Sequence, residues 1–533
     1  MSDFRLRWLR NRKRTDVELP LKAPIHLGDR SNAEYFYEAT PQERLAEKLA
    51  LEKAEEGARR YNIDRREFMA SAMGVATTLA MINVAQGCSD NNGGSGGGGQ
   101  GGSGGGGPRD GGYYDVGPNP MDADAACASI LDPSKEFIFD IQTHHVNRSE
   151  TTAFASFLRQ QQHYARACNP GDPVACFSRN EYARLMFLES DTTVAVLSGL
   201  PAPNEEASPI ANHEIAETRD AINAIAAGTE RVVNHHMVLP NRTGKTASDV
   251  AAQLEAMETN LARVGKIGAW KTYPAWSPNN TQEVALDGYR YDDPVLGVPM
   301  IERGLELGVN TFCIHKGLPI VGFSEEFNDP KDIGVIAKRF SQANFIVYHS
   351  GFLNQRQFEI PYTQGSRAGT NSLITALIEN QIGPGQNVYA ELGTSWQFAK
   401  GDPSAAAHMI GKLLKYVGED NVVWGTDCMW YGSPQEQITA FLQFQISEAF
   451  QTQYGYPALT MERKRKILGL NAARIYGVDV QAARCAVDRS ALAQFKRSLD
   501  AEYGRYRWAF EKPKLTTRRD FWRVLREHEF KPG

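Results

Sequence analysis

Short apolar runs recur along the chain from residue 136 onward, and each run ends in small or polar residues before a stretch of helical periodicity. Their interiors are almost continuously apolar, as in Phe-Ile-Val-Tyr at 345–348, which is typical of parallel strands buried on both faces. We predict eight strands, at residues 137–146, 192–200, 231–239, 266–273, 311–318, 344–352, 387–394 and 422–430.

The stretches between the strands predict helices. Residues 248–264, 298–307 and 405–417 place apolar side chains at helical spacing and leave a polar face. Eight strand–helix units in about 350 residues favour an α/β fold of the (β/α)8 TIM barrel type. The alternative is a doubly wound open sheet, which usually carries a glycine-rich phosphate loop after its first strand, and none follows here. We expect the barrel to occupy residues 113–480.

The N-terminal region, residues 1–88, has a different pattern. It is polar and rich in arginine, and a capping-box pattern predicts that a helix begins at Thr40. Arg65 and Arg66 precede a weakly apolar run of small residues at 70–85, which favours a twin-arginine (Tat) export signal over a membrane-spanning helix. The alternative is an arginine pair in an ordinary amphipathic helix.

A glycine-rich linker, residues 89–112, follows this region, and its composition predicts a flexible tether. Cys88 directly precedes the linker, as the lipidated first residue of a mature lipoprotein does, although residues 84–87 depart from the usual lipobox. We therefore expect a disordered export segment that the Tat machinery recognises. The protein would be exported to the periplasm and, if Cys88 is lipidated, anchored to a membrane.

The C-terminal tail, residues 481–533, is rich in arginine, lysine and aromatic side chains. This composition favours helices packed on the barrel. The alternative is a contact with a membrane surface or with a second copy of the chain in a homo-oligomer.

Composition narrows the classes of function. The chain of 533 residues carries 58 Lys and Arg against 63 Asp and Glu, and this net charge of −5 argues against a nucleic-acid-binding protein. Seven cysteines are too few for a disulfide scaffold. A small molecule is the expected substrate.

Residues that bind metals recur at the carboxyl ends of the predicted strands, where barrels of this type place their chemistry. Only 11 histidines occur in the chain, yet His144 ends the first predicted strand, His315 the fifth and His349 the sixth, while Asp427 ends the eighth. Imidazoles and a carboxylate that converge from different strands are suitable ligands for a divalent metal ion.

The order of these residues resembles the amidohydrolase superfamily, within the branch that includes aminocarboxymuconate semialdehyde decarboxylase. A closing stretch at 467–477 is similar to that branch's C-terminal helix, and the resemblance covers roughly residues 136–480. It implies a divalent metal, Zn²⁺ or alternatively Mn²⁺, held or lined by four residues. Gln142 stands where the first histidine of the family's D-x-H-x-H pattern is expected, and it would bind through its neutral carbonyl oxygen. The four residues are Gln142, His144, His315 and Asp427.

The resemblance also implies catalytic roles. The metal would lower the pKa of a water molecule to about 7, and Asp427 would act as general acid and base. His349 would polarise a carbonyl or stabilise an oxyanion. Lys271, at the fourth strand end, would bind substrate or form a structural salt bridge. Trp270 and Trp430 would line the site for a cyclic or aromatic carboxylate or lactone, or else would only pack at its rim.

Three functions remain open from the sequence. The first is a metal-dependent hydrolase, and the second is a non-oxidative decarboxylase that uses the same site. The third is a catalytically silent binding lipoprotein, for which the replacement at Gln142 is the main support. The histidines and Asp427 argue against the third, because a binding module does not need that set of residues.

Overall fold

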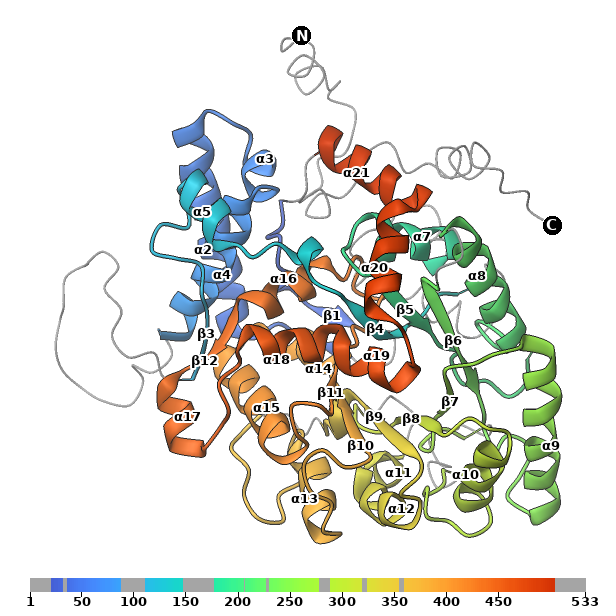
Figure 1. The fold of residues 1–533 in the computed structure, drawn as a ribbon. Helices are drawn as coiled ribbons and strands as arrows, with labels where there is room; N and C mark the ends of the chain where they lie inside the picture. The colour runs from blue at the N-terminus through green and yellow to red at the C-terminus, as the bar shows by residue number, and fades with distance from the viewer. Residues whose placement is uncertain are drawn as a thin grey trace.

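A closed barrel of eight parallel strands forms the centre of the molecule (Figure 1). The computed structural model describes residues 21–31, 36–87, 111–146, 177–205, 207–226, 230–277, 288–318, 324–353 and 359–503. Each strand pairs with its neighbours in chain order. The strands are β4 (Phe139–Thr143), β5 (Val194–Leu197), β6 (Val232–Met237), β7 (Ala269–Thr272), β8 (Thr311–His315), β9 (Asn344–Tyr348), β10 (Val388–Glu391) and β11 (Val422–Val423).

The barrel closes where β4 meets the chain that follows β11. Thr143 bridges Cys428 in parallel, and the backbone N–H of Asp427 donates to the carbonyl of Gln142 at 2.9 Å. All eight predicted strands and the TIM barrel fold are therefore confirmed. The observed strands are shorter than predicted at their carboxyl ends, because the last residues of the predicted runs form the loops that carry the candidate site.

Helices surround the sheet on its outer side (Figure 1). The three predicted helices are present as α9 (Ala247–Val264), α10 (Gly297–Glu306) and α15 (Pro403–Tyr416). The side chain of Thr246 caps the first turn of α9, and Gly265 ends the helix with a positive φ of 74°. Other helices that follow strands of the barrel are α8 (Asn212–Ile225), α12 (Ile333–Arg339), α13 (Asn371–Glu379) and α16 (Gln435–Gln443).

Shorter helical turns connect these elements. They are α5 (Ala123–Ser129), η2 (Pro133–Lys135), α7 (Arg179–Ala183), η5 (Arg184–Leu188), α11 (Glu325–Asn328), η6 (Pro330–Asp332), η7 (His349–Gly351), α14 (Ser395–Ala399), α17 (Glu448–Tyr454), α18 (Met461–Arg465), η8 (Lys466–Leu470) and α19 (Asn471–Tyr476). Two small antiparallel sheets complete the fold. They pair β1 (Arg30–Ser31) with β2 (Phe36–Tyr37), and β3 (Gly112–Tyr114) with β12 (Phe444–Ile446).

The N-terminal region corrects one expectation. Where a disordered export segment was predicted, the described part forms α2 (Pro41–Tyr61), α3 (Arg65–Met69) and α4 (Ala72–Gly87), and α2 begins at the predicted capping box of Thr40. Ten of the sixteen residues of α4 are buried, and the helix packs against α2, α5, α15 and β3. The apolar run is therefore part of a packed core. Residues 1–20, Cys88 and most of the glycine-rich linker lie outside the described residues.

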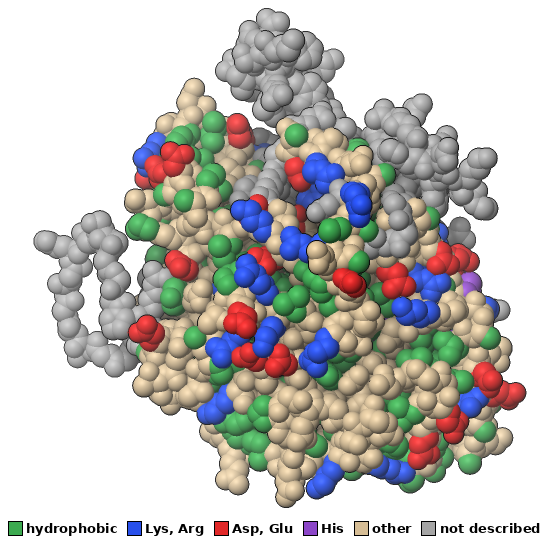
Figure 2. Space-filling view, viewed as in Figure 1, with side chains coloured by type: hydrophobic (Ala, Val, Ile, Leu, Met, Phe, Trp, Pro, Cys, Tyr) green, Lys and Arg blue, Asp and Glu red, His purple; other side chains and the backbone are tan. Residues whose placement is uncertain are grey.

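The described part of the C-terminal tail is helical, as predicted. It consists of α20 (Val480–Arg489) and α21 (Ala491–Tyr503), and α21 packs on η5 beside the barrel. Lys496 on α21 forms an ion pair with Asp191 at 3.3 Å. Among the helices of the described residues, none is both long and apolar enough to cross a membrane. Figure 2 shows basic and acidic side chains interspersed over the visible face of the molecule.

Candidate active site

The strand ends bring five of the predicted site residues together inside the barrel. His144 Nε2 lies 3.3 Å from Asp427 Oδ1, and the side-chain nitrogen of Gln142 lies 3.5 Å from His349 Nε2. The rings of His349 and His315 meet edge to face, with their centroids 4.6 Å apart. Each of the five side chains is almost completely buried. The position of these residues at one end of the barrel is what the strand pattern predicts.

Two backbone carbonyls fix how the histidines present their ring nitrogens. His144 Nδ1 lies 2.9 Å from the carbonyl oxygen of Ser198, and His349 Nδ1 lies 2.8 Å from that of Gly393. A carbonyl oxygen only accepts, so each Nδ1 carries the proton. When neutral, each ring therefore directs the lone pair of its Nε2 into the site, which is the arrangement that metal-binding histidines have.

Asp427 is held as a carboxylate at the closing seam of the barrel. Thr394 Oγ1 donates to its Oδ2 at 2.6 Å, and the Tyr431 hydroxyl lies 3.0 Å from Thr394 Oγ1. Burial by itself raises the pKa of Asp427, but His144, His349 and the Thr394 hydroxyl outweigh burial and lower this pKa below its ordinary value. His144 stabilises the charge in either of two ways, as an imidazolium that donates to Oδ1 or as a neutral ring that shares a cation with it.

The expected role of His349 as an oxyanion stabiliser does not fit this geometry. Burial lowers the pKa of His349 to about 4, so the ring is neutral at physiological pH. Its single proton is on Nδ1, which faces the Gly393 carbonyl, and Nε2 is left as an acceptor. An oxyanion requires a donor. The geometry instead makes His349 a metal ligand or a proton acceptor.

Glu391, at the end of β10, is a site residue that the sequence reasoning missed. Its carboxyl group accepts hydrogen bonds from the backbone N–H of His349, at 2.9 Å, and of Gly393. Burial raises its pKa to about 8. A Cβ added to Gly425 would lie 1.7 Å from Glu391 Oε1, so this glycine makes room for the carboxyl group. A carboxylate followed by Leu-Gly at a strand end was the available signal.

Lys271 points into the barrel from β7. Its Nζ lies 3.2 Å from the centroid of the Tyr348 ring and 4.8 Å from that of Tyr273, so aromatic faces surround the cation. The Tyr273 ring in turn stacks on His315 at 4.8 Å. Lys271 thus borders the histidine cluster from the side of β7 and β8.

The two predicted tryptophans lie in different places. Trp430 stacks near His144, with a centroid separation of 6.1 Å, and so lines the site. Trp270 precedes Lys271 in β7 and points to the opposite face, where its indole N–H donates to Val309 O at 3.2 Å and its ring contacts Gly304 of α10. Trp270 packs between sheet and helices, so it does not fit the substrate wall that was assigned to it.

The imidazole nitrogens, the carboxylate and the amide oxygen of this cluster are chemically suitable ligands for a divalent cation. Among the described residues, no three or more His, Cys, Asp and Glu side chains are grouped as a ready-made metal site. Nε2 of His144 nevertheless faces the buried carboxylate of Asp427, Nε2 of His349 lies beside the Gln142 amide, and Gln142 Oε1 is buried without a hydrogen-bond partner. Converging acceptors of this kind repel one another unless a positive charge lies between them.

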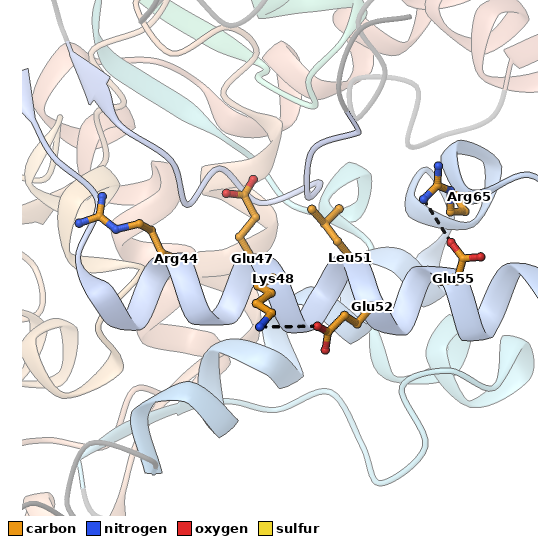
Figure 3. Close-up of a pocket in the computed structure, with 7 residues that line it drawn as sticks. All are labelled: Arg44, Glu47, Lys48, Leu51, Glu52, Glu55 and Arg65. Atoms are coloured by element: carbon orange, nitrogen blue, oxygen red, sulfur yellow. Dashed lines mark hydrogen bonds and ion pairs between the residues drawn. The ribbon is translucent and has the colours of Figure 1, made fainter.

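A separate surface groove runs along α2 and contains none of these residues (Figure 3). Two ion pairs form within the groove, Lys48 with Glu52 at 3.9 Å and Arg65 with Glu55 at 3.1 Å. The paired charges leave no dominant sign to select a ligand. Arg44, Glu47, Lys48, Leu51, Glu52, Glu55 and Arg65 line the groove.

Comparison with known proteins gives one family. The family model described as Amidohydrolase matches residues 212–478, half of the chain, which includes β6 to β11 but not β4. No curated protein matches the sequence.

Several solved structures are similar to the chain. An uncharacterised TIM-barrel protein of Bordetella bronchiseptica is 14% identical, with a TM-score of 0.41 over 65% of this chain and 99% of that one. A putative 2-pyrone-4,6-dicarboxylic acid hydrolase of Pseudomonas putida is 13% identical, with a TM-score of 0.34 over 64% and 98%. A dihydroxybenzoic acid decarboxylase of a Polaromonas species, with bound manganese and 2-nitroresorcinol, is 14% identical, with a TM-score of 0.38 over 64% and 97%.

Proposed function

Because the chain belongs to the amidohydrolase family, we propose that it is a metal-dependent hydrolase whose reaction takes place between the ends of β4, β8, β9 and β11. The observation that carries the proposal is the pair formed by His144 and Asp427. The imidazole and the carboxylate lie 3.3 Å apart in a fully buried position, and the Ser198 carbonyl holds His144 with its Nε2 toward the carboxylate. Burial of an ionised carboxylate costs free energy, and buried carboxylates of this kind are concentrated at functional sites.

Gln142, His144, His315 and Asp427 would hold the divalent cation, zinc or manganese, and His349 is a further candidate ligand. A bound cation of this kind supplies Lewis acidity, which lowers the pKa of water toward 7 and polarises a substrate carbonyl. Gln142 would contribute its carbonyl oxygen, which is the buried acceptor atom without a partner.

Asp427 carries the proton transfer in this proposal. Its lowered pKa keeps it ionised at neutral pH, so it accepts a proton from the attacking water and returns it to the leaving group. Glu391 does not touch the substrate in this scheme. It fixes the backbone at His349, since it accepts that residue's N–H, and it acts as a positioning residue.

Lys271 favours a carboxylate substrate and supports a second candidate function. Its buried ammonium group borders the histidine cluster, where it would pair with the carboxylate of a small cyclic or aromatic acid or lactone. If that carboxylate is bound next to the cation, the same site would release carbon dioxide, and the protein would be a non-oxidative decarboxylase.

Metal content is the deciding experiment. We expect the full chain to purify with near-stoichiometric zinc or manganese by inductively coupled plasma mass spectrometry, and a His144→Ala/Asp427→Ala variant to lose it. His145→Ala is the matched control, because the neighbouring side chain faces away from the site toward Thr218 at 3.0 Å. A folded wild-type chain that takes up no metal after reconstitution would support the binding-protein alternative.

Substrate assays then separate the two reactions. Lactones and aromatic carboxylates would be offered to the metal-loaded protein, and the products would be followed by mass spectrometry and by carbon dioxide release. Ring opening with uptake of water identifies the hydrolase. Carbon dioxide with no uptake of water identifies the decarboxylase.

A further inference from the structure

The N-terminal arm, residues 21–31 and 36–40, is buried against the loop that follows β10. The side chains of Ala23, Ile25 and Leu27 are at most 1% exposed. The arm's backbone is held on both sides at His26, whose N–H donates to Glu436 and whose carbonyl accepts from Lys400 Nζ at 2.7 Å. Lys400 directly follows α14, so the arm is bound to the end of that short helix.

Arg30 joins the arm, α2 and α14 at one point. Its guanidinium is fully buried and donates to Glu43 on α2 at 2.5 Å and to the carbonyl of Phe398 on α14 at 3.3 Å. It also lies 4.2 Å above the ring of Tyr37, which stacks on Phe398 with centroids 4.7 Å apart. A buried charge with this many partners fixes the elements that it joins.

A short chain of contacts leads from α14 to the candidate catalytic carboxylate. The Phe398 ring meets the edge of Tyr431 at 6.5 Å, the Tyr431 hydroxyl lies 3.0 Å from Thr394 Oγ1, and Thr394 donates to Asp427 at 2.6 Å. Thr394 has a φ of +56°, a region that β-branched residues rarely adopt. Such a conformation persists only where its surroundings hold it.

The helices that follow the arm are also attached to the fold around the barrel, at β3 and at α15. Asn83 on α4 exchanges two hydrogen bonds with the backbone of Tyr114 on β3, both at 2.8 Å. On either side of residues 88–110, Gln86 and Gly111 both contact Ser404 of α15: Gln86 by a hydrogen bond, and Gly111 so closely that an added Cβ would lie 2.2 Å from its hydroxyl. The chain therefore leaves and re-enters the described fold at the same place.

We propose that residues 21–87 are a permanent part of the catalytic unit, and that the arm holds residues 394–399 so that Thr394 orients Asp427. The inference rests on the proposed function, since orientation of Asp427 matters only if this carboxylate binds the metal and transfers the proton. A mature chain that begins at Cys88, as the predicted lipoprotein would, lacks the residues that brace this loop. Export, if it occurs, would then have to leave the N-terminal residues on the protein.

Arg30→Met in the full chain tests this bracing. We expect faster hydrogen–deuterium exchange at residues 394–399 and a rise of about 10- to 100-fold in the Kd for Mn²⁺, the usual effect of losing a residue that supports a metal ligand. Arg231→Met is the matched control. Arg231 is also a buried arginine that donates to two backbone carbonyls and covers an aromatic ring, but it stands just before β6, at the opposite end of the barrel.

Tyr431→Phe tests the inner part of the chain of contacts if Arg30→Met does not fold. It removes only the hydroxyl next to Thr394, and we expect a smaller rise in the Mn²⁺ Kd with unchanged thermal stability. Unchanged exchange at 394–399 in folded Arg30→Met, or equal changes in Arg231→Met, overturns the inference. An unchanged Mn²⁺ Kd in Tyr431→Phe overturns it as well.

The two proposals fail in different ways. A wild-type chain that binds no Mn²⁺ overturns the proposed function, while faster exchange at 394–399 in Arg30→Met alone would still support the bracing. Isolation of an active, metal-bound mature chain that begins at or after Cys88, without residues 21–87 bound to it, overturns the inference and leaves the proposed function intact.

Discussion

Two regions of the molecule each bury a carboxyl group completely: the seam between β4 and β11, and the end of β10. The pKa values of these two carboxyl groups nevertheless shift in opposite directions. Asp427 at the seam faces His144 and accepts from a threonine hydroxyl, and its pKa is lowered. Burial raises the pKa of Glu391 to about 8, since the two backbone N–H groups that donate to it lower this pKa by less than burial raises it. Burial is common to both, so the neighbours decide which carboxyl group carries charge at pH 7.

Asp427→Asn is expected to have the largest effect. The amide keeps the shape of the side chain but cannot accept a proton, so kcat should fall by about 10²- to 10⁴-fold. Glu391→Gln, measured in parallel by steady-state kinetics on the substrate found, should stay within about tenfold of the wild type, since it only supports the backbone at His349. Equal losses in the two variants would contradict the different roles assigned here.

Gly425→Ala tests the space around Glu391. The new Cβ would lie 1.7 Å from Oε1, so the carboxyl group must move, and we expect a loss of about 1–3 kcal/mol in the free energy of unfolding. Gly383→Ala is the control, because its Cβ would meet only Gln386 at an ordinary 3.7 Å. Denaturant titration of both variants measures the difference. A tolerated Gly425→Ala would show that Glu391 is not confined.

The pH dependence of stability isolates the raised pKa of Glu391. The folded chain keeps this proton up to about pH 8, whereas the unfolded chain releases it near the ordinary value of 4.5, so stability falls as pH rises between these values. The slope from this one group is at most about 1.4 kcal/mol per pH unit. Glu391→Gln should remove that contribution when unfolding is compared at pH 5 and pH 8. Parallel curves for the two proteins would contradict the raised pKa.

Thr394→Val should have the smallest effect on turnover. The variant keeps the volume but loses the hydrogen bond to Asp427, and a net hydrogen bond of ordinary strength corresponds to a decrease in kcat of about threefold to tenfold. Thr394→Ser keeps the hydroxyl and relieves the branched side chain at positive φ, so it should retain wild-type kcat. If the two variants behave alike, the hydroxyl has no role at Asp427.

The barrel and much of the site were predictable because both follow from the periodicity of strands. Apolar runs mark the strands, and the polar residues that end them must meet at one end of a barrel. Glu391 was not predicted because a glutamate followed by Leu-Gly at a strand end is a weak signal without a histidine beside it. Trp270 was misplaced because the alternation of a strand puts Trp270 outside when Lys271 points inside.

The N-terminal helices show where sequence patterns have two explanations. A weakly apolar run of small residues is typical of a signal segment, but it also lets helices approach closely. A Cβ on Gly57 would lie 2.2 Å from the ring of Phe68, and one on Gly74 would lie 2.4 Å from Met69 Cα. These small side chains serve tight packing between α2, α3 and α4. Contacts between distant segments decide whether such a run is a signal segment or part of a packed core. Local composition does not encode those contacts.

The closing seam has a consequence for synthesis on the ribosome. The backbone N–H of Asp427 donates a hydrogen bond to Gln142, so the two chain segments that complete the site are separated by almost three hundred residues. One is the first barrel strand, and the other directly follows the last. A nascent chain lacks Asp427, and so lacks the complete centre, until the residues after its final strand have emerged. Premature reactivity in an unfinished polypeptide is thereby avoided, and the appearance of activity reports that the whole ring of strands has formed.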